Sequence, residues 1–349
     1  MTLGPLMIDV QGTQLQPEDR EVLLHPLVGS VILFTRNFES SEQLQRLVAD
    51  IQALRTPQLL VAVDHEGGRV QRFRKEFTVL PAMRLIGRQY DIDAATGRDL
   101  AHRCGWLMAA ELRAVGIDFS FAPVVDLDYG VSEVIGNRAF HRDPRIVAEL
   151  ALAFVGGMRQ AGMAATAKHF PGHGAVVADS HLALPVDRRP YQDLVDDLYP
   201  FQRLIDNDVP AVMAAHIVFA EVDSLPASFS PRWLQVELRQ RMGFQGAVFT
   251  DDLTMQGAGI MGGVADRVQA ALNAGCDVLP VCNNRSGVHE VLDRLGDAAD
   301  PVSQFRQARL RGVPPALSRE QLLASDMWVQ CQEAISLIRE RPDLTLDAS

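Results

Sequence analysis

Short apolar runs recur along the chain and alternate with segments that carry helix signals. About eight of these runs are rich in Val, Ile, Leu and Phe; they cover Leu6–Val10, Ser30–Thr35, Leu59–Asp64, Ile117–Pro123, Ala164–His169, Ala211–His216, Ala247–Asp251 and Asp277–Val281. They are continuously apolar rather than alternating, which is typical of parallel strands buried on both faces.

The segments between the runs show the periodicity and the end signals of helices. Asp143 is placed to cap a helix that has Pro144 in its first turn, an apolar stripe from Ile146 to Met158, and Gly162 at its end. Ser318 with Gln321 is typical of a capping box near the end of the chain. Repeating βα units of this kind predict an α/β fold, a (β/α)8 barrel of the TIM type.

We expect residues 1–349 to form one domain, because no linker or repeat divides the chain, and we expect roughly the last ten residues to be disordered. A doubly wound open sheet is the alternative fold. It is disfavoured because no G-x-G-x-x-G follows a strand and no P-loop is present.

Composition and charge narrow the class of partner. Lys and Arg number 33 against 44 Asp and Glu, a net charge of −11, and no basic cluster exists, so a nucleic-acid partner is not expected. The sequence has no secretory signal and no long apolar run, which predicts no membrane association. Four widely spaced cysteines without metal-ligand spacing indicate buried thiols in a cytoplasmic protein.

Polar residues, nearly all of them ionisable, follow almost every apolar run. In a barrel of this kind the active site lies at the carboxyl ends of the strands, where these residues would meet. They are Asp64, His65, Glu66, Arg69 and Arg72; Asp126 and Asp128; Asn137 and Arg138; Lys168, His169 and His173; His216; and Asp251 and Asp252. Gathering so many charges out of water is costly, so their convergence predicts a catalytic mouth.

The segment KHFPGHG and the Asp-Ser-His that follows it contain the candidate proton donor. Asp179 and His181 are two residues apart on a glycine-containing loop, so the carboxylate can orient the imidazole, and histidine can exchange protons near neutral pH. The alternative interpretation of Asp-Ser-His alone is an ordinary surface turn.

The same segment contains the ligand types of a metal site, in His169, His173, Asp179 and His181. Pro171 and Gly172 lie between the two histidines of the H-x-x-x-H spacing, so these cannot share a helix face. We therefore favour a site without a metal or any other cofactor.

The segment FTDDLTM contains the second candidate group. Asp251 is the first residue after its strand that can face the mouth, where a carboxylate suits a nucleophile, while Asp252 should point elsewhere and cap the next turn. If both aspartates are only caps, the segment has no catalytic role. His216 ends a neighbouring strand, where we favour a supporting position.

Five further residues have the side chains that bind sugar hydroxyls, because aspartate and arginine supply hydrogen bonds of both polarities. They are Asp64, Arg72, Arg138, Lys168 and His169. Each of them could instead form a salt bridge between neighbouring loops, for example Asp64 with Arg69 or Arg72.

Taken together, VDHEGGRVQRF, GNRAFHRDP, KHFPGHG followed by DSH, and GFQGAVFTDDLTM resemble the family 3 glycoside hydrolases over about residues 4 to 300. Among these, the chain looks most similar to bacterial cytoplasmic β-N-acetylglucosaminidases (β-hexosaminidases) of peptidoglycan recycling. Short members of that family are single (β/α)8 barrels.

The resemblance implies a retaining hydrolase that removes N-acetylglucosamine from anhydro-N-acetylmuramic acid, free or as a muropeptide. Asp251 would be the nucleophile, His181 the acid/base and Asp179 its partner, while Asp64, Arg72, Arg138, Lys168 and His169 would bind the sugar. Using histidine as the acid/base departs from the usual pair of carboxylates. A phosphorylase with the same residues, a family 3 enzyme for another sugar and a non-catalytic sugar-binding barrel remain alternatives.

Overall fold

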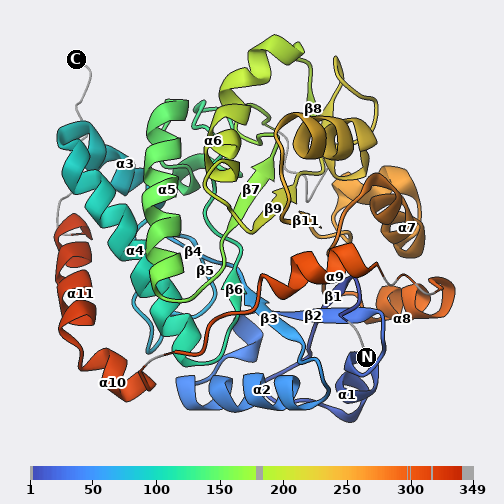
Figure 1. Ribbon diagram of the computed structural model, residues 1–349, viewed down its shortest axis with the longest axis horizontal. Helices are drawn as coiled ribbons and strands as arrows, with labels where there is room; N and C mark the ends of the chain where they lie inside the picture. Colours follow the sequence, from blue (N-terminus) through green and yellow to red (C-terminus); the bar gives the residue numbers. More distant parts are fainter. Residues whose placement is uncertain (1–2, 178–183, 297, 299, 316, 340–349) are drawn as a thin grey trace.

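The computed structural model describes residues 3–177, 184–296, 298, 300–315 and 317–339. Parallel strands occupy its centre and helices surround them (Figure 1). The central strands are β1 (Leu6–Asp9), β2 (Val28–Leu33), β3 (Leu60–Val63), β6 (Phe119–Ser120), β7 (Thr166–Phe170), β9 (Ala211–Ala214), β11 (Ala247–Thr250) and β12 (Leu279–Val281). Each of them overlaps one of the predicted apolar runs, so the prediction of buried parallel strands is confirmed.

The central strands form two parallel sheets. The order is β12-β1-β2-β3-β6 in the first sheet and β11-β9-β7 in the second. Only isolated parallel bridges join them, from Phe119 to Ala164 and from Val124 to Lys168 at one seam, and from Phe249 to Val278 at the other. The parallel strands of the predicted barrel are therefore present, but their hydrogen-bonded ladders do not form one continuous closed sheet.

Proline accounts for part of this interruption. Pro123 lies beside the first seam and Pro280 lies within β12 at the second, and proline has no N–H to donate to a ladder. Each still accepts a bond there, Pro123 from Lys168 N at 3.3 Å and Pro280 from Leu253 N at 2.9 Å. The neighbouring strands meet at each seam through several backbone hydrogen bonds, for example Thr166 N to Ala122 O at 2.8 Å and Thr250 N to Val278 O at 3.1 Å, but without a continuous strand ladder.

The surrounding helices follow the strands in the alternation that the sequence predicts. They are α1 (Pro17–Leu23), α2 (Ser41–Ala53), α3 (Met83–Ile92), α4 (Ala94–Ala114), α5 (Pro144–Gln160), α6 (Val195–Ile205), a helical segment Arg232–Arg241, α7 (Val264–Ala274), α8 (Arg285–Arg294), α9 (Pro301–Ala308), α10 (Arg319–Leu323) and α11 (Asp326–Arg339). Asp143 caps α5 by accepting from Arg145 N at 2.8 Å, as predicted. The capping box of Ser318 and Gln321 also forms, at the start of the short α10.

Two small strand pairs were not predicted. Strand β8 (Val186–Asp187) pairs with β10 (Val218–Phe219), and an antiparallel hairpin joins β4 (His65–Gly67) to β5 (Val70–Gln71). The hairpin turns at Gly67 and Gly68, whose φ angles of 111° and 56° favour glycine. It matters for function because it folds the chain after β3 back over the strand ends.

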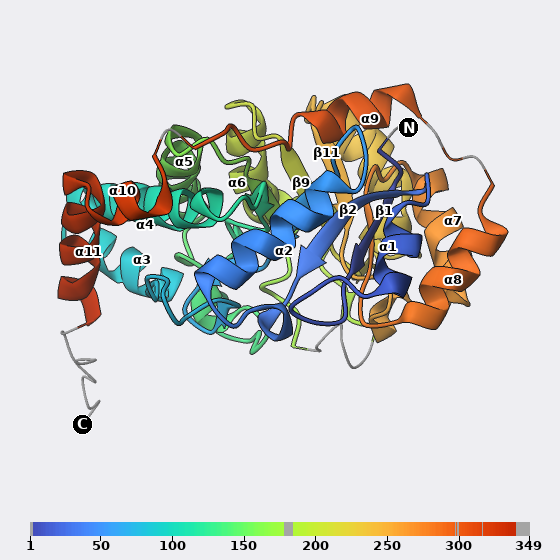
Figure 2. The ribbon, with the colours of Figure 1, turned by 90° about the horizontal axis from the view of Figure 1, so that it is seen from below.

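The two C-terminal helices α10 and α11 lie beside α4 at one edge of the molecule (Figures 1 and 2). Trp328 on α11 donates its indole N–H to the buried carboxylate of Glu111 on α4, over 2.8 Å. The same carboxylate accepts from the N–H and hydroxyl of Thr78, at 2.8 and 2.6 Å. The end of the described chain is thereby tied to the segment that follows the β4–β5 hairpin.

All four cysteines are buried thiols that form no disulfide bond, as the sequence predicts. Among the described residues, every helix is too short or too polar to cross a lipid bilayer.

Candidate active site

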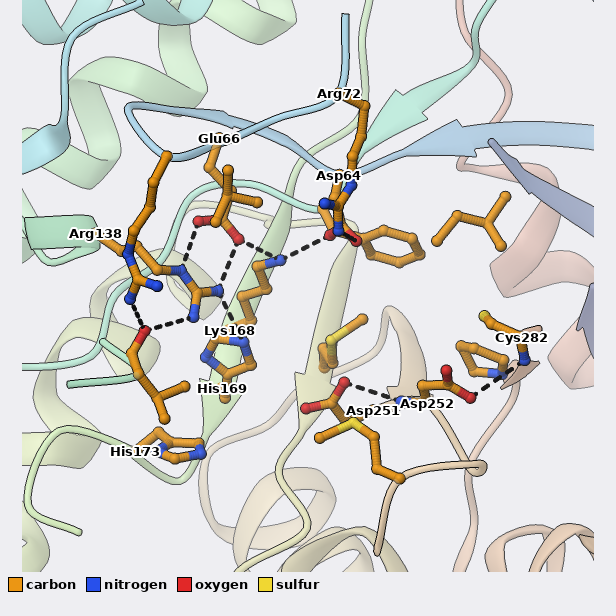
Figure 3. A pocket seen from close by; sticks show the side chains of 18 of the residues that line it. Asp64, Glu66, Arg72, Arg138, Lys168, His169, His173, Asp251, Asp252 and Cys282 are labelled. Carbon is orange, nitrogen blue, oxygen red and sulfur yellow. Dashed lines mark hydrogen bonds and ion pairs between the residues drawn. The ribbon is translucent and has the colours of Figure 1, made fainter. Parts of the chain in front are cut away.

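A cavity of about 730 Å³ opens at the carboxyl ends of the central strands. Six of the predicted site residues line it: Asp64, Arg72, Arg138, Lys168, His169 and Asp251. Figure 3 shows them with Asp251 set apart from the cluster that Glu66 and Arg138 form. The prediction that residues from separate strand ends converge on one face is confirmed.

Asp251 directly follows β11 and is held by backbone bonds. Its N–H donates to Ala214 O on β9 at 3.0 Å, and its Oδ1 accepts from Asp252 N at 2.9 Å. Burial by itself raises the pKa of the Asp251 carboxyl, but His169, His216, the N–H of Asp252 and Lys168 together outweigh burial and lower that pKa overall. Asp251 is therefore an ionised carboxylate facing the cavity at neutral pH.

Asp252 points away from its neighbour, as predicted. Its Oδ1 accepts from Thr254 N at 2.9 Å and from Cys282 N at 3.2 Å, so it caps the turn after β11. Burial, together with the charge of Asp251, raises the pKa of Asp252 to about 6. Adjacent aspartates thus differ in role and in proton affinity.

Lys168 lies at the centre of the polar cluster. Its Nζ is 2.6 Å from Glu66 Oε1 and 3.1 Å from Asp64 Oδ1, and Glu66 also receives two hydrogen bonds of 2.8 Å from Arg138. Burial alone lowers the pKa of Lys168, yet Glu66 and Asp64 raise it overall. Burial raises the pKa of Glu66, but Arg138 and Lys168 bring it far below its usual range. Glu66 and Lys168 therefore both stay charged at neutral pH.

Asp64 and Arg72 meet across the hairpin, with Arg72 Nη2 at 3.3 Å from Asp64 Oδ2. One of the salt bridges considered from the sequence therefore exists. Both side chains nevertheless line the cavity and are partly exposed to it. The ion pair and a role in binding are compatible, because each group keeps a face toward the cavity.

His169 is oriented by Asp126. Its Nδ1 is 2.7 Å from Asp126 Oδ2, and its Nε2 is 3.4 Å from Arg138 Nη2. Because a guanidinium only donates, these partners assign the proton to Nδ1 and leave Nε2 as the acceptor. Asp126 Oδ1 also accepts from the backbone N–H groups of His169 and His173, at 3.1 and 2.7 Å.

The loop after β7 is fixed in its first part by close approaches at two glycines. Gly172 has a φ of 142°, and a Cβ there would lie 2.8 Å from the Cβ of Asp197. A Cβ on Gly174 would lie 1.8 Å from the carbonyl oxygen of Leu127. The predicted acid/base pair, Asp179 and His181, lies outside the described residues.

Only part of the predicted metal site can be described, because two of its four proposed ligands, Asp179 and His181, also lie outside the described residues. Within the described ranges, no group of three or more His, Cys, Asp or Glu side chains could hold a metal ion. Two of its four proposed ligands, His169 and His173, are described, and His169 is committed to Asp126.

Sequence reasoning missed two buried carboxylates of the site. Glu66 and Asp126 were noted at strand ends but received no role, although both are buried and hold other site residues. The signal was their position directly after apolar runs. Their partners come from distant segments, so only the fold identifies them.

The chain also matches a known protein family over most of its length. The family model described as "Glycosyl hydrolase family 3 N terminal domain" matches residues 6–311. The chain belongs to glycosyl hydrolase family 3. It is therefore a glycoside hydrolase, as its motifs indicate.

Several relatives match over nearly their full length. A protein named Beta-hexosaminidase from Thioalkalivibrio sulfidiphilus is 56% identical over 347 residues, which is 99% of this chain and 100% of the relative. Its counterpart from Nitrosospira multiformis is 51% identical over 98% of each chain. The crystal structure of NagZ from Neisseria gonorrhoeae in complex with N-trifluoroacetyl-D-glucosamine is 43% identical, with a TM-score of 0.93 over 98% of this chain and 99% of that chain.

Proposed function

We propose that this protein is a retaining β-N-acetylglucosaminidase that releases N-acetylglucosamine from anhydro-N-acetylmuramic acid, free or as a muropeptide. The observation that carries the proposal is Asp251, an ionised carboxylate at a strand end that faces a cavity lined by charged groups of both signs. Relatives named Beta-hexosaminidase and the NagZ complex with an N-acylated glucosamine support the choice of sugar.

Asp251 is the proposed nucleophile. One carboxylate oxygen attacks the anomeric carbon, the bond to the leaving oxygen breaks, and a covalent glycosyl-enzyme forms. Oδ1 already accepts a hydrogen bond from Asp252 N, so Oδ2 is the oxygen we assign to the attack. Water then displaces the carboxylate from the same carbon, and two inversions retain the β configuration.

His181 is the proposed acid/base, with Asp179 orienting it. The protonated imidazole donates to the leaving oxygen in the first step, and the neutral imidazole removes a proton from water in the second. Both residues lie beyond Val177, the last described residue of the loop that begins in the cavity wall. No metal or other cofactor takes part in this scheme.

The charged cluster is the proposed sugar-binding surface. Asp64, Arg72, Arg138, Lys168 and His169 present acceptors and donors whose directions are already fixed by ion pairs. A sugar that binds to such a preorganised surface loses less free energy in ordering side chains. Glu66 and Asp126 support this surface: Glu66 pairs with Arg138 and Lys168, and Asp126 pairs with His169.

We infer further that the two sheets are arcs of one (β/α)8 barrel and that residues 1–349 form a single domain. The isolated bridges at both seams support this closure, because they connect the edge strands of the two sheets in order. A cytoplasmic location and a role in peptidoglycan recycling follow the resemblance of the motifs and are part of the proposal.

Hydrolysis of an aryl β-N-acetylglucosaminide, followed by NMR, tests the proposal. We expect β-N-acetylglucosamine as the first product, much slower turnover of the matching aryl β-glucoside, and release of N-acetylglucosamine from a disaccharide that ends in anhydro-N-acetylmuramic acid. A first product of α configuration would exclude the retaining mechanism. A sugar phosphate formed in phosphate buffer would indicate a phosphorylase instead.

A further inference from the structure

His216 takes no part in the mechanism above, yet it contacts the residue next to the nucleophile. It lies two residues beyond β9, is fully buried, and is stacked on Phe229 with 5.4 Å between ring centroids and 9° between planes. Its Nε2 is 3.0 Å from the backbone oxygen of Asp252, and its Nδ1 is 2.7 Å from Ser228 Oγ. A buried histidine with a partner on each nitrogen has a fixed ring orientation.

The partners of His216 also assign its tautomer. A carbonyl oxygen only accepts, so Nε2 carries the hydrogen and donates it to Asp252 O. Nδ1 then accepts from the hydroxyl of Ser228, whose own N–H donates to Ala215 O at 3.1 Å. Burial lowers the pKa of His216, against the charge of Asp251, in keeping with a neutral ring.

The contact matters because Asp252 is the residue that orients Asp251. The carbonyl oxygen of Asp252 accepts a hydrogen bond from His216 Nε2 at 3.0 Å and a second one from Met255 N at 3.1 Å. Its carboxylate is held by the N–H groups of Thr254 and Cys282, and its own N–H donates to Asp251 Oδ1. The side chains of Thr254 and Cys282 also bond to that carboxylate, whereas His216 donates from its side chain to the backbone carbonyl.

We propose that His216 is a positioning residue for the nucleophile: by donating Nε2–H to the carbonyl of Asp252, it fixes the turn that directs Asp251 Oδ2 at the anomeric carbon. The inference rests on the proposed function, because it assigns the attack to Asp251. His216 touches neither the sugar nor the leaving group in this scheme.

This role has a kinetic signature. The nucleophile forms its bond in the first step and leaves in the second, whatever the aglycone is, so misplacing it slows turnover of good and poor leaving groups alike. Loss of the acid/base affects mainly poor leaving groups. The sugar-binding residues keep their positions, so affinity for the product should not change.

Two substitutions at the same site separate hydrogen bonding from packing. In His216→Gln the amide nitrogen falls near the position of Nε2 and can still donate to Asp252 O, whereas in His216→Asn it corresponds to Nδ1 and cannot reach. We expect kcat of His216→Asn to fall by about 10- to 100-fold, since small misplacements of reacting groups have effects of this order. We expect the kcat of His216→Gln within about threefold of wild type, and KM of both within about threefold, on the same argument.

The measurements are kcat and KM with aryl β-N-acetylglucosaminides of high and low leaving-group pKa, the dissociation constant for N-acetylglucosamine, and the melting temperature. Equal losses on both substrates in His216→Asn, with recovery in His216→Gln and unchanged product affinity, support the proposal. The proposal is overturned if His216→Asn keeps wild-type kcat, if the Gln variant loses as much as the Asn variant, or if the loss depends on the leaving group.

Asp251→Ala, measured alongside, separates the two levels of inference. An inactive Asp251→Ala together with a fully active His216→Asn overturns the role of His216 alone. Wild-type turnover in Asp251→Ala overturns the proposed function and the role of His216 together.

Discussion

Buried charges gather at both ends of the central strands, but they are arranged differently at each end. At the amino ends, Asp118 precedes β6 and accepts from Val61 N on β3, while Asp277 precedes β12 and accepts from Val248 N on β11, at 2.9 and 2.8 Å. Each carboxylate thus satisfies the backbone of a neighbouring strand. At the carboxyl ends, the charges line a cavity instead.

Arginines complete the amino-end sites. Arg311 and Arg113 are 3.0 and 3.6 Å from Asp118. Arg239 and Arg306 are 2.7 and 3.1 Å from Asp277. In both cases the arginines come from other segments and close the bottom of the sheets.

The comparison corrects one step of the sequence argument. Convergence of charged residues was taken as a sign of function, yet this protein gathers buried ion pairs at its non-catalytic end as well. The distinguishing feature is direction. The carboxylate oxygens of Asp118 and Asp277 accept hydrogen bonds from backbone N–H groups and arginines. Asp251 and Asp64 instead line a cavity of about 730 Å³.

The largest expected effect separates the two ends by activity. Asp251→Ala should reduce kcat by roughly 10⁴-fold or more, because removing a nucleophile eliminates the covalent route. Its free energy of unfolding should stay within about 1 kcal/mol of wild type or rise, since a catalytic carboxylate is placed for chemistry rather than stability. Turnover assays and urea unfolding measure both quantities, and a protein that fails to fold would contradict this assignment.

The complementary substitution is at Asp118, at the amino ends of the central strands. Asp118→Ala removes the carboxylate that pairs with two arginines and accepts from two backbone N–H groups, so it should lower the free energy of unfolding by about 3–5 kcal/mol. The kcat/KM of the protein that remains folded should not change. Urea unfolding with activity measured well below the transition checks this. A selective loss of activity at wild-type stability would mean that the two ends are not functionally distinct.

Glu66 tests whether one carboxylate can serve both purposes. It is buried like Asp118 but holds Arg138 and Lys168 at the cavity wall. Glu66→Gln weakens charge-assisted hydrogen bonds that contribute roughly 1.5–3 kcal/mol, so kcat/KM should fall by about 10- to 100-fold, mainly through KM. Glu133→Gln is the matched control, since Glu133 lines the same cavity but is exposed. Equal effects of the two substitutions would argue against the special role of Glu66.

The smallest effect concerns pH. The pKa of Asp252 is about 6 in the folded protein, above its value of about 3.8 in an unfolded chain. The stabilisation linked to this proton is therefore complete below pH 3.8 and is lost as pH rises through 6. The stability of wild type should decline relative to Asp252→Asn between pH 5 and 7, in urea unfolding at each pH. Parallel stabilities across this range would contradict the raised pKa.

The sequence predicted most of the framework, because each central strand is a local apolar run that needs burial on both faces. It also placed Asp251 and Asp252 correctly, since their directions follow from the end of β11. The β4–β5 hairpin was missed, because its few residues carry little periodic signal. The closed ring was predicted from the number of βα units, whereas the pairing at the two seams depends on backbone contacts between segments that are distant in the chain.

Pairing at the site was the least predictable part. Glu66 and Asp126 are adjacent in space to Lys168 and His169 but about a hundred and about forty residues away in the chain. Which of several neighbouring ionisable groups pairs with which depends on side-chain directions at adjacent strand ends. Residue types alone do not fix those directions. Asp179 and His181 lie outside the described residues, so their roles stay predictions.

The contact between Trp328 and Glu111 shows that the family match and the folded structure end at different residues. The family match ends at residue 311, whereas one of the three hydrogen bonds to the Glu111 carboxylate comes from helix α11, which begins at Asp326. A chain shortened to the family match would keep every residue of the described cavity and would expose a buried acid together with the α4 surface around it. The family model is thus shorter than the folded unit, in which α11 covers part of α4, and relatives such as the one from Thioalkalivibrio sulfidiphilus match over 99% of this chain.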